Sequence, residues 1–413
     1  MKALLITTGY LPYTFSECLC NAKLVYALQK SGWEVDVISR LDDGLSYSRE
    51  WTEPWLCLRQ NTYEITYPLG NSFSRFCDLI HSTIVMGYPL EGIRWARRAY
   101  KKAAKLHEKK HYDVVFTRSP SDVPHIVGYK LKKRFGIRWI ANWNDPSATI
   151  WPEPYTHHFS IWKSNMLNRY TIQCLKAADI NTFPSQSLLD HFIEHFPFLQ
   201  NQRTEVISHI ALWDSLYAPC ERVKNDKLYL CHSGNLSIER NPELLFRAMR
   251  EVIDEGCTHI RLDIMGHIND YTQELIDKYG LSDYVCCTGS FTYMEAMQRI
   301  QNYDVLVLLE ARMKKGIFFA SKFTDYAQGG RPIFAVSPAN GFAKDMISQF
   351  GGGLVVNNEN YKDIKRGLGE LYYAWENNKL SDNYSPTQLY SQFSAQNIVD
   401  IYNDIGKRLL LGF

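Results

Sequence analysis

The sequence predicts an α/β protein built from two Rossmann-like domains, each a parallel sheet covered by helices. Two observations lead to this fold class. The 413 residues are too many for one ordinary domain and suit two of about 200. Short apolar runs that read as strands also alternate with amphipathic stretches of helical period along the whole chain, and this alternation is typical of parallel sheets with crossover helices.

In the first half, strands and helices alternate from the N-terminus onward. The strands are expected at Ala3–Thr8, Glu34–Ser39, Asp113–Thr117, Arg138–Trp143, Ile180–Phe183 and Glu205–Ser208. The helices between them are expected at Cys20–Ser31, Gly92–Lys110, Val123–Phe135, His158–Ala177 and Gln186–His195. The aromatic, turn-rich stretch Leu41–Leu90 fits no βα unit, and we expect it to be an excursion near a site.

The second half repeats the scheme. Its strands are expected at Leu228–His232, Ile260–Met265, Tyr284–Cys287, Asp304–Leu309, Pro332–Val336 and Leu354–Val356. The polar stretch Ala211–Asp226 lacks a clear period and predicts the boundary between the halves. We therefore expect a first domain over residues 1–212, a second over 213–384 and a helical segment over 385–413.

Composition excludes several classes of protein. The net charge of +2 predicts no nucleic-acid partner. No segment reaches the roughly 18 consecutive apolar residues of a membrane span, and the apolar run at the N-terminus is too short for a signal peptide. The ten cysteines are scattered without zinc-finger spacing, which favours a reduced, cytoplasmic setting.

The segment from Gly316 to Pro332 predicts an anion site. It lies between two apolar strand candidates and contains an expected short helix from Ser321 to Gln328. Ser321 and Lys322 would open this helix, where unpaired backbone N–H groups favour an anion. One turn on, Asp325 would face the same pocket. Such a turn can bind a phosphate beside a sugar hydroxyl.

Three further loops follow strand candidates, where ligands of doubly wound sheets bind. After the first strand, Gly9 would let the backbone approach a ligand. The loop at 142–146 places two amides and a carboxylate at a strand end, although Asp-Pro is also an ordinary turn former. The glycine loop at 232–242 opens a helix and has Arg240 just ahead of it, whose planar guanidinium suits a diphosphate.

These motifs resemble those of retaining glycosyltransferases of family four, which have the GT-B fold of two Rossmann-like domains facing across a cleft. The resemblance covers nearly the whole chain except Leu41–Leu90. It implies a nucleotide-sugar donor, a glycan or lipid-linked acceptor, a role in surface polysaccharide synthesis and no metal or other cofactor. It also implies that the segment over 385–413 crosses back onto the first domain.

The resemblance assigns roles to residues that match family motifs. The implied donor site comprises Gly234, Asn235, Arg240, Gly266, Ser290, Phe291, Ser321, Lys322 and Asp325. Asn144 and Asp145 match positions that reach the transferred sugar, and Gly9 and Tyr10 lie on the implied acceptor side. The chain departs from the family in four places. Residues 15–17 stand where a pair of glycines is usual on the acceptor side, and Asn144 stands where histidine or arginine is frequent. Asn235 stands for an arginine, and Ile317 for the first glutamate of the family's paired motif.

Other readings remain open. His191 to His195 fits the H-x-x-E-H pattern of zinc peptidases, but the helix ends at once before Pro197. The basic stretch Arg94–Lys110 is either a solvated helix face or a patch for an anionic membrane surface, which would make the protein peripheral on the membrane. A nucleotide-sugar epimerase of the same fold and a non-catalytic GT-B scaffold are alternative functions.

Overall fold

A computed structural model describes residues 1–42, 51–67, 72–119, 121–217 and 225–411. The chain divides into two compact units, one of Met1–Trp213 with Ala395–Phe413 and one of Asp214–Ser394. Parts of two expected segments, the excursion at 41–90 and the boundary at 211–226, lie outside the described residues.

The first unit contains a parallel seven-stranded sheet in the order β3-β2-β1-β4-β5-β6-β7. Its strands are β1 (Lys2–Thr7), β2 (Glu34–Asp42), β3 (Thr62–Tyr67), β4 (Val114–Arg118), β5 (Arg138–Asn142), β6 (Ile180–Phe183) and β7 (Thr204–Val206). The order reverses between β1 and β4, which pair in register from Ala3 opposite Val114. The apolar strands β1 and β4 are buried at nearly every position, because helices cover both faces of the sheet.

The helices of this unit are α1 (Ser16–Lys30), α2 (Ser72–Met86), α3 (Ile93–Lys110), α4 (Val123–Phe135), α5 (Ile161–Ala177), α6 (Gln186–His195) and α15 (Ala395–Leu411). The last of these packs on the first unit: the Tyr402 ring lies 5.6 Å from that of Phe116, and the Trp33 indole donates to Asn403 at 2.7 Å. The end of the chain thus belongs to the first sheet, whereas residues 385–394 group with the second unit.

The expectation that residues 41–90 contain no βα unit is wrong. After a short 3-10 helix, Trp55–Asn61, strand β3 pairs in parallel with β2 and is followed by α2. The reason is that β3 is an edge strand and every residue in it is at least partly exposed, so its sequence lacks an apolar run. Helix α2 does carry apolar residues at helical spacing, but they lie on its exposed side.

Helix α3 buries an apolar stripe formed by Trp95, Ala99, Ala103 and Leu106. The basic stretch Arg94–Lys110, interpreted from the sequence as a solvated face or a membrane patch, does not turn all of its side chains outward. The side chains of Arg94 and Arg97 are only 15% and 18% exposed, because both bind Asp78 of α2. Lys110 at the other end binds Asp36 of β2 at 2.6 Å.

The second unit contains a parallel six-stranded sheet in the order β10-β9-β8-β11-β12-β13. Its strands are β8 (Leu228–Ser233), β9 (Ile260–Met265), β10 (Val285–Cys287), β11 (Val305–Leu309), β12 (Ile333–Ser337) and β13 (Gly353–Asn357). Its helices are α7 (Glu243–Asp254), α8 (Asp270–Lys278), α9 (Tyr293–Arg299), α10 (Lys322–Gln328), α11 (Phe342–Phe350), α12 (Tyr361–Glu376), α13 (Leu380–Tyr384) and α14 (Thr387–Phe393). The order reverses between β8 and β11, so both sheets follow the doubly wound scheme predicted from the sequence.

Helix α12 packs on the sheet through a glycine. A Cβ atom on Gly367 would lie 2.7 Å from Val356 Cγ1 and 2.9 Å from a ring carbon of Phe334. Both neighbours are core residues that cannot withdraw. Two residues on, a Cβ atom on Gly369 would have no neighbour within 4 Å. The two glycines therefore differ in whether the packing requires them.

This pair yields a stability prediction. Gly367→Ala should destabilise the protein by about 1–3 kcal/mol, because it overpacks the helix–sheet contact. Gly369→Ala is the matched control on the same helix and should stabilise it by about 0.5–1 kcal/mol, because alanine favours helix. Urea unfolding of the two variants measures both effects. Equal effects would contradict the close packing of α12.

Candidate functional site

The residues predicted from the sequence lie at the carboxyl ends of the strands at each reversal of strand order and of the strands beside them. In a doubly wound sheet this is where two neighbouring crossover helices diverge and leave room for a ligand. In the second unit, the glycine loop follows β8 and Glu310 follows β11. In the first unit, Gly9 follows β1 and Ser119 follows β4.

Lys322, the first residue of α10, reaches the glycine loop after β8. A Cβ atom on Gly234 would lie only 2.6 Å from the Lys322 Nζ atom, and Gly234 has φ of 122°, a region that favours glycine. A side chain at 234 would therefore displace the ammonium group. The glycine predicted as a donor-loop residue serves to let this cation lie against the backbone.

Arg240 lies near enough to Lys322 to affect its ionisation. Burial, then the positive charge of Arg240, lower the pKa of Lys322 to about 7, and Asp325 offsets this only in part. Glu310 belongs to the same group, since burial raises its pKa to about 7 while Arg240 opposes that rise. Two neighbouring cationic side chains, both half-buried, form a site for an anion.

The expected helix is present as α10, with Ser321 as its N-terminal cap residue. The Ser321 hydroxyl makes no cap hydrogen bond, and Asp325 accepts a hydrogen bond from the Tyr293 hydroxyl at 2.8 Å. Tyr326 of the same helix is fully buried, and its hydroxyl accepts from the Ser233 backbone N–H at 2.8 Å. Tyr326 thus fixes α10 against the end of β8, which places Lys322 beside Gly234.

Gly266, at the end of β9, allows a second loop to approach the first. A Cβ atom there would lie 2.5 Å from the Gly234 carbonyl oxygen. Asn235 is exposed, and its side-chain oxygen accepts from the His267 backbone N–H at 2.8 Å. Where the family has an arginine, this asparagine therefore joins the two loops, and the cation that lies beside the glycine loop is Lys322.

The loop after β10 contains Ser290 and Phe291. Ser290 is exposed, while Phe291 is half-buried and lies 3.9 Å from the Arg299 guanidinium. Tyr293 connects the start of α9 to Asp325 through the hydrogen bond already described. A hydrogen bond thus joins α9 to α10, whereas the Phe291 ring contacts the Arg299 side chain.

In the first unit, Asn144 lies in a buried polar network. Its backbone N–H donates to the Ser119 hydroxyl at 2.8 Å, and its side-chain amide donates to the Glu17 carboxyl group. The Asn144 Oδ1 atom is buried without a hydrogen-bond partner among the described residues. That oxygen can accept a hydrogen bond from a ligand hydroxyl, in agreement with the orienting role expected for an asparagine.

Three carboxyl groups gather near Asn144. Burial raises the pKa of Glu17 to about 8, and the Arg118 guanidinium, 3.7 Å away, offsets the rise only in part. Burial also raises the pKa of Asp145 to about 6 and that of Asp122 to about 7. These groups can exchange protons near neutral pH.

The two acceptor-side residues lie in different surroundings. The Gly9 backbone belongs to the polar network, because its carbonyl oxygen accepts from the Asn21 side chain at 2.7 Å and Asn21 also binds Arg118. The Tyr10 ring is only 1% exposed and packs edge-on against Trp51 at 6.4 Å. Tyr10 is therefore a core residue in this structure, and its ring does not line an open surface.

Sequence reasoning missed Glu17, Arg118, Glu310 and Tyr326. Arg118 and Glu310 were detectable in principle, because each is a charged residue at the end of an apolar strand. Their significance depends on strand order, however, since only the strands at the reversal point meet a ligand. Nothing in the sequence singles out Tyr326, whose role comes from its reach to Ser233.

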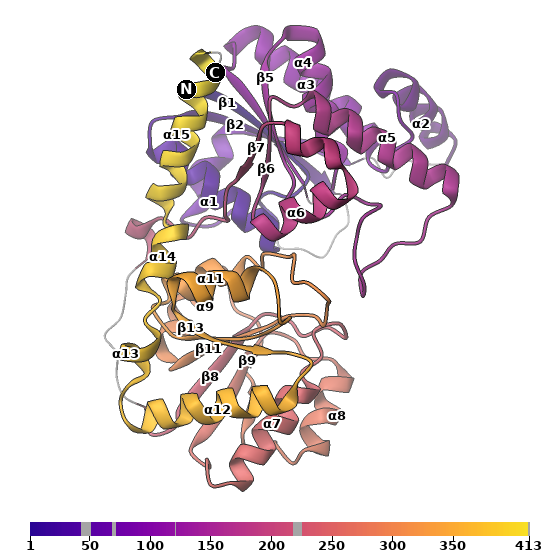
Figure 1. The fold of residues 1–413 in the computed structure, drawn as a ribbon. Coiled ribbons are helices and arrows are strands. Elements are labelled where there is room, and N and C mark those ends of the chain that lie inside the picture. The colour runs from indigo at the N-terminus through magenta and orange to yellow at the C-terminus, as the bar shows by residue number, and fades with distance from the viewer. Residues whose placement is uncertain (43–50, 68–71, 120, 218–224, 412–413) are drawn as a thin grey trace. The chain divides into compact units, whose positions relative to one another are not determined.

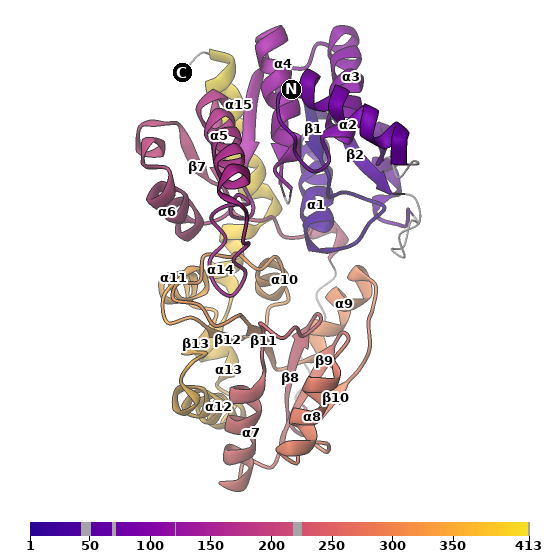
Figure 2. The same ribbon diagram turned by 90° about the vertical axis from the view of Figure 1, so that its right-hand side faces the viewer.

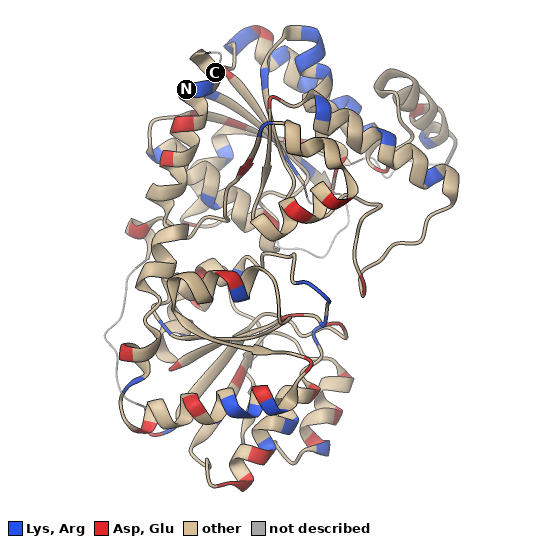
Figure 3. Ribbon diagram, in the orientation of Figure 1, with Lys and Arg blue, Asp and Glu red and all other residues tan. Residues whose placement is uncertain are grey.

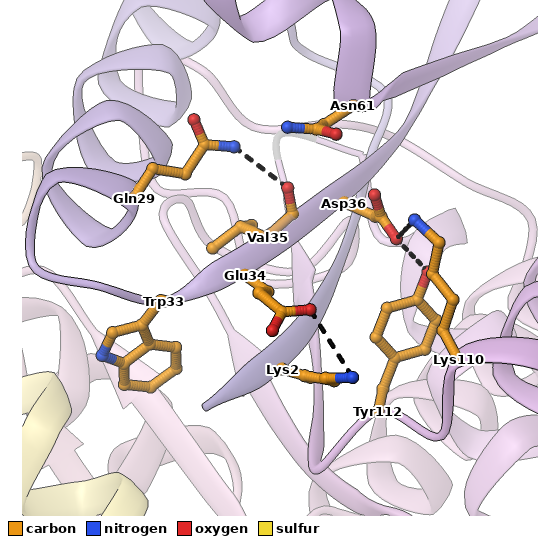
Figure 4. Close-up of a pocket in the computed structure, with 9 residues that line it drawn as sticks. All are labelled: Lys2, Gln29, Trp33, Glu34, Val35, Asp36, Asn61, Lys110 and Tyr112. Atoms are coloured by element: carbon orange, nitrogen blue, oxygen red, sulfur yellow. Dashed lines mark hydrogen bonds and ion pairs between the residues drawn. The ribbon is translucent and has the colours of Figure 1, made fainter.

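Two other features are weaker candidates for a functional site. A cavity of about 410 Å³ at the start of β1 and β2 lies at the opposite edge of the first sheet, and its charges pair with one another: Lys2 with Glu34 and Lys110 with Asp36 (Figure 4). In the pattern that suggested zinc, the His191 ring contacts the Ile150 carbonyl oxygen at 2.7 Å. Within the described part of the chain, no three potential ligands gather as a metal site.

Comparison with protein families identifies both halves of the chain. The model of Glycosyltransferase Family 4 matches residues 21–210, and that of Glycosyl transferases group 1 matches residues 219–386. The first match contains every strand of the first sheet except β1, and the second contains all six strands of the second sheet. No match was found among curated protein sequences.

Solved structures share the fold over the full length of the chain. Sucrose-phosphate synthase from Thermosynechococcus elongatus has a TM-score of 0.70 at 14% identity, with 100% of each chain covered. Anabaena HepE in complex with UDP has a TM-score of 0.66 at 14% identity, and the match covers 98% of this chain and 99% of HepE. A putative UDP-N-acetylglucosamine 2-epimerase from Listeria monocytogenes has a TM-score of 0.60 at 10% identity, and the match covers 100% of this chain and 97% of the Listeria protein.

These findings agree with the doubly wound sheets and with the loops at their points of reversal. The family matches confirm the resemblance predicted from the motifs, and the structural matches confirm the fold class. The chain belongs to the group 1 glycosyltransferases and has the GT-B fold.

Proposed function

We propose that the protein transfers a sugar from a nucleotide-sugar to a glycan or lipid-linked acceptor with retention of configuration, in surface polysaccharide synthesis. The observation that carries the donor assignment is the half-buried pair of cations, Lys322 and Arg240, beside the glycine loop that follows β8. The similar HepE was solved with UDP and with UDP-glucose, which makes a UDP-sugar the first donor to test. In the present chain, the nine cysteines that the structure describes are free, which supports a reducing, cytoplasmic setting.

The chemistry follows from where charge develops. As the bond between the sugar and the diphosphate breaks, negative charge grows on the departing phosphate oxygens. Lys322 and Arg240 would stabilise that charge electrostatically, so the proposed reaction needs no metal. The new bond forms to an acceptor oxygen, and its proton passes to the departing phosphate on the same face. Asn144 and Asp145 would orient sugar hydroxyls from the first unit.

Two alternatives each have a specific observation behind them. The alternative of a nucleotide-sugar epimerase rests on the fold shared with the Listeria protein, whose description is a putative UDP-N-acetylglucosamine 2-epimerase. Product formed from the nucleotide-sugar without any acceptor would favour the epimerase. The scaffold reading rests on Ile317, which is 2% exposed and stands where the family has a glutamate. Failure to bind any nucleotide would favour the scaffold.

The first functional prediction concerns Lys322 and Arg240, the phosphate clamp of the proposed donor site. In a thermal-shift panel of UDP-, GDP-, ADP- and dTDP-sugars, one nucleotide-sugar should raise the melting point of the protein. Arg240→Ala and Lys322→Ala should each weaken its binding by about 1.5–3 kcal/mol, because each removes a charged hydrogen-bond donor. Lys379→Ala is the control, since that lysine is 60% exposed and pairs with Asp382. Unchanged affinity in both clamp variants would remove the assignment.

The second prediction concerns pH. The pKa of Lys322 is about 7 in the free protein, and a bound diphosphate should raise it. Affinity should therefore be constant below pH 7 and fall by up to about tenfold per pH unit above it, as the free lysine loses its proton. Glu310, whose pKa is also about 7, adds to the fall because its ionised form repels phosphate.

Titration calorimetry between pH 6 and 9 measures this slope. Lys322→Met should bind weakly with a shallower slope, and adding Glu310→Gln should flatten what remains. The pKa of His232 is lowered by burial, Lys322 and Arg240, so that ring stays neutral throughout. A slope that survives both substitutions would show that neither group controls binding.

The third prediction concerns metal. Because cationic side chains serve the phosphates, turnover should persist in excess EDTA. Elemental analysis should find no stoichiometric zinc. Zinc that disappears on changing His191 and His195 to alanine would instead support the peptidase pattern.

A further inference from the structure

Helix α2 presents its apolar side outward. Phe73, Phe76, Ile80 and Ile84 recur at helical spacing on one face, and their exposed fractions are 79%, 59%, 46% and 76%. Leu79 and Val85 flank this face and are also exposed. A contiguous apolar face of this kind is unusual on a soluble protein and marks a surface that another body covers.

The opposite side of α2 is polar and faces α3. The Asp78 carboxylate binds the Arg94 Nε atom at 2.7 Å and the Arg97 Nη1 atom at 2.6 Å, and Arg98 lies 3.9 Å away. These arginines hold the pKa of Asp78 below its usual value although burial opposes this. The partly buried ion pairs fix the rotation of α2 about its axis, so its apolar face cannot turn inward.

A second exposed apolar group lies on the same side of the unit. Ile161 and Trp162 open helix α5 and are 82% and 69% exposed. Helix α2 and the first turn of α5 both project on the right-hand side of the unit in Figure 1, the side that faces the viewer in Figure 2. Lys163 follows directly, which is the mixture of aromatic and basic residues found at membrane interfaces.

The charge of this region is strongly positive. Residues 72–110 contain nine Lys or Arg and three Asp or Glu, whereas the whole chain has 46 and 44. The rest of the chain is therefore net acidic, and the positive charge concentrates beside the apolar face (Figure 3). This combination complements an anionic surface that also accepts apolar side chains.

We propose that the outer face of α2, with Ile161 and Trp162, docks on an anionic lipid bilayer. The apolar side chains would enter the boundary between headgroups and acyl chains while α2 lies along the surface. Within the described residues, no helix is long and apolar enough to cross a membrane, which fits attachment from one side. The basic residues of α3 would act behind α2 and attract the bilayer over a distance.

A second copy of the chain fits this face less well. A two-fold contact through α2 would bring two such basic regions against each other, and their mutual repulsion opposes it. An anionic bilayer meets both requirements, since it covers apolar residues and neutralises the lysines and arginines. Oligomerisation through α2 is therefore the competing outcome to be measured.

Vesicle sedimentation tests the proposal with the full chain. The protein should pellet with phosphatidylglycerol–phosphatidylcholine vesicles and far less with phosphatidylcholine alone. Phe76→Asn with Ile84→Asn should lower the partition constant by at least about tenfold, because burying one such side chain accounts for about that factor. Tyr373→Asn is the control: it removes a ring that is 69% exposed on α12 in the other unit and should change nothing.

A label at Cys77 gives a second readout. Cys77 is exposed on the outer side of α2, and an environment-sensitive dye there should shift to the blue with anionic vesicles. Cys57, Cys220 and Cys287 are changed to serine for this measurement. Raising salt should weaken binding without abolishing it, since the apolar contribution remains.

Three results would overturn the proposal. They are no binding at low salt, equal binding of the double variant and the wild type, and a concentration-dependent dimer that the double variant breaks without any vesicle binding. Light scattering separates the last of these from docking. Vesicle binding needs no nucleotide, so its failure leaves the proposed reaction untouched.

Discussion

The second unit depends on burying one ammonium group beside another cation. Removing Lys322 from water is unfavourable, and Arg240 makes it more so, which is why the pKa of the lysine falls to about 7. The surrounding structure makes the arrangement possible. Gly234 leaves space for the ammonium group, and Tyr326 holds α10 where the lysine must reach. An arriving diphosphate would relieve the repulsion, so binding energy is built into the free protein.

The first unit shows the same physics with the opposite sign. Glu17, Asp122 and Asp145 lie in a buried network where low polarity raises the pKa of each carboxyl group toward neutrality. Arg118 and Asn144 hold Glu17 in place. Both units have the same doubly wound fold. The second unit has a pair of cations near the point where its strand order reverses, and the first unit has a group of carboxyl groups with raised pKa values near its own reversal point.

Helix α2 illustrates how an ion pair can decide which side of a helix meets solvent. Apolar residues normally turn toward the core, yet here Asp78 faces inward to reach Arg94 and Arg97. The outward apolar face is stable only because the charged contact fixes the helix against α3. The same arginines that suggested a membrane patch from the sequence therefore act by orienting the helix that would make the contact.

The sequence by itself determined the fold class, because strand and helix periods arise from local burial and need no tertiary information. It also pointed to the loops that we propose bind the donor, since glycines, prolines and charges at strand ends can be read without tertiary information. Tertiary structure decided the rest. The edge strand β3 lacks an apolar run, the Lys322 ammonium meets Gly234 across 88 positions of sequence, and Tyr10 turns into the core. Each depends on which strands become neighbours, and neighbours far apart in sequence leave no periodic signal.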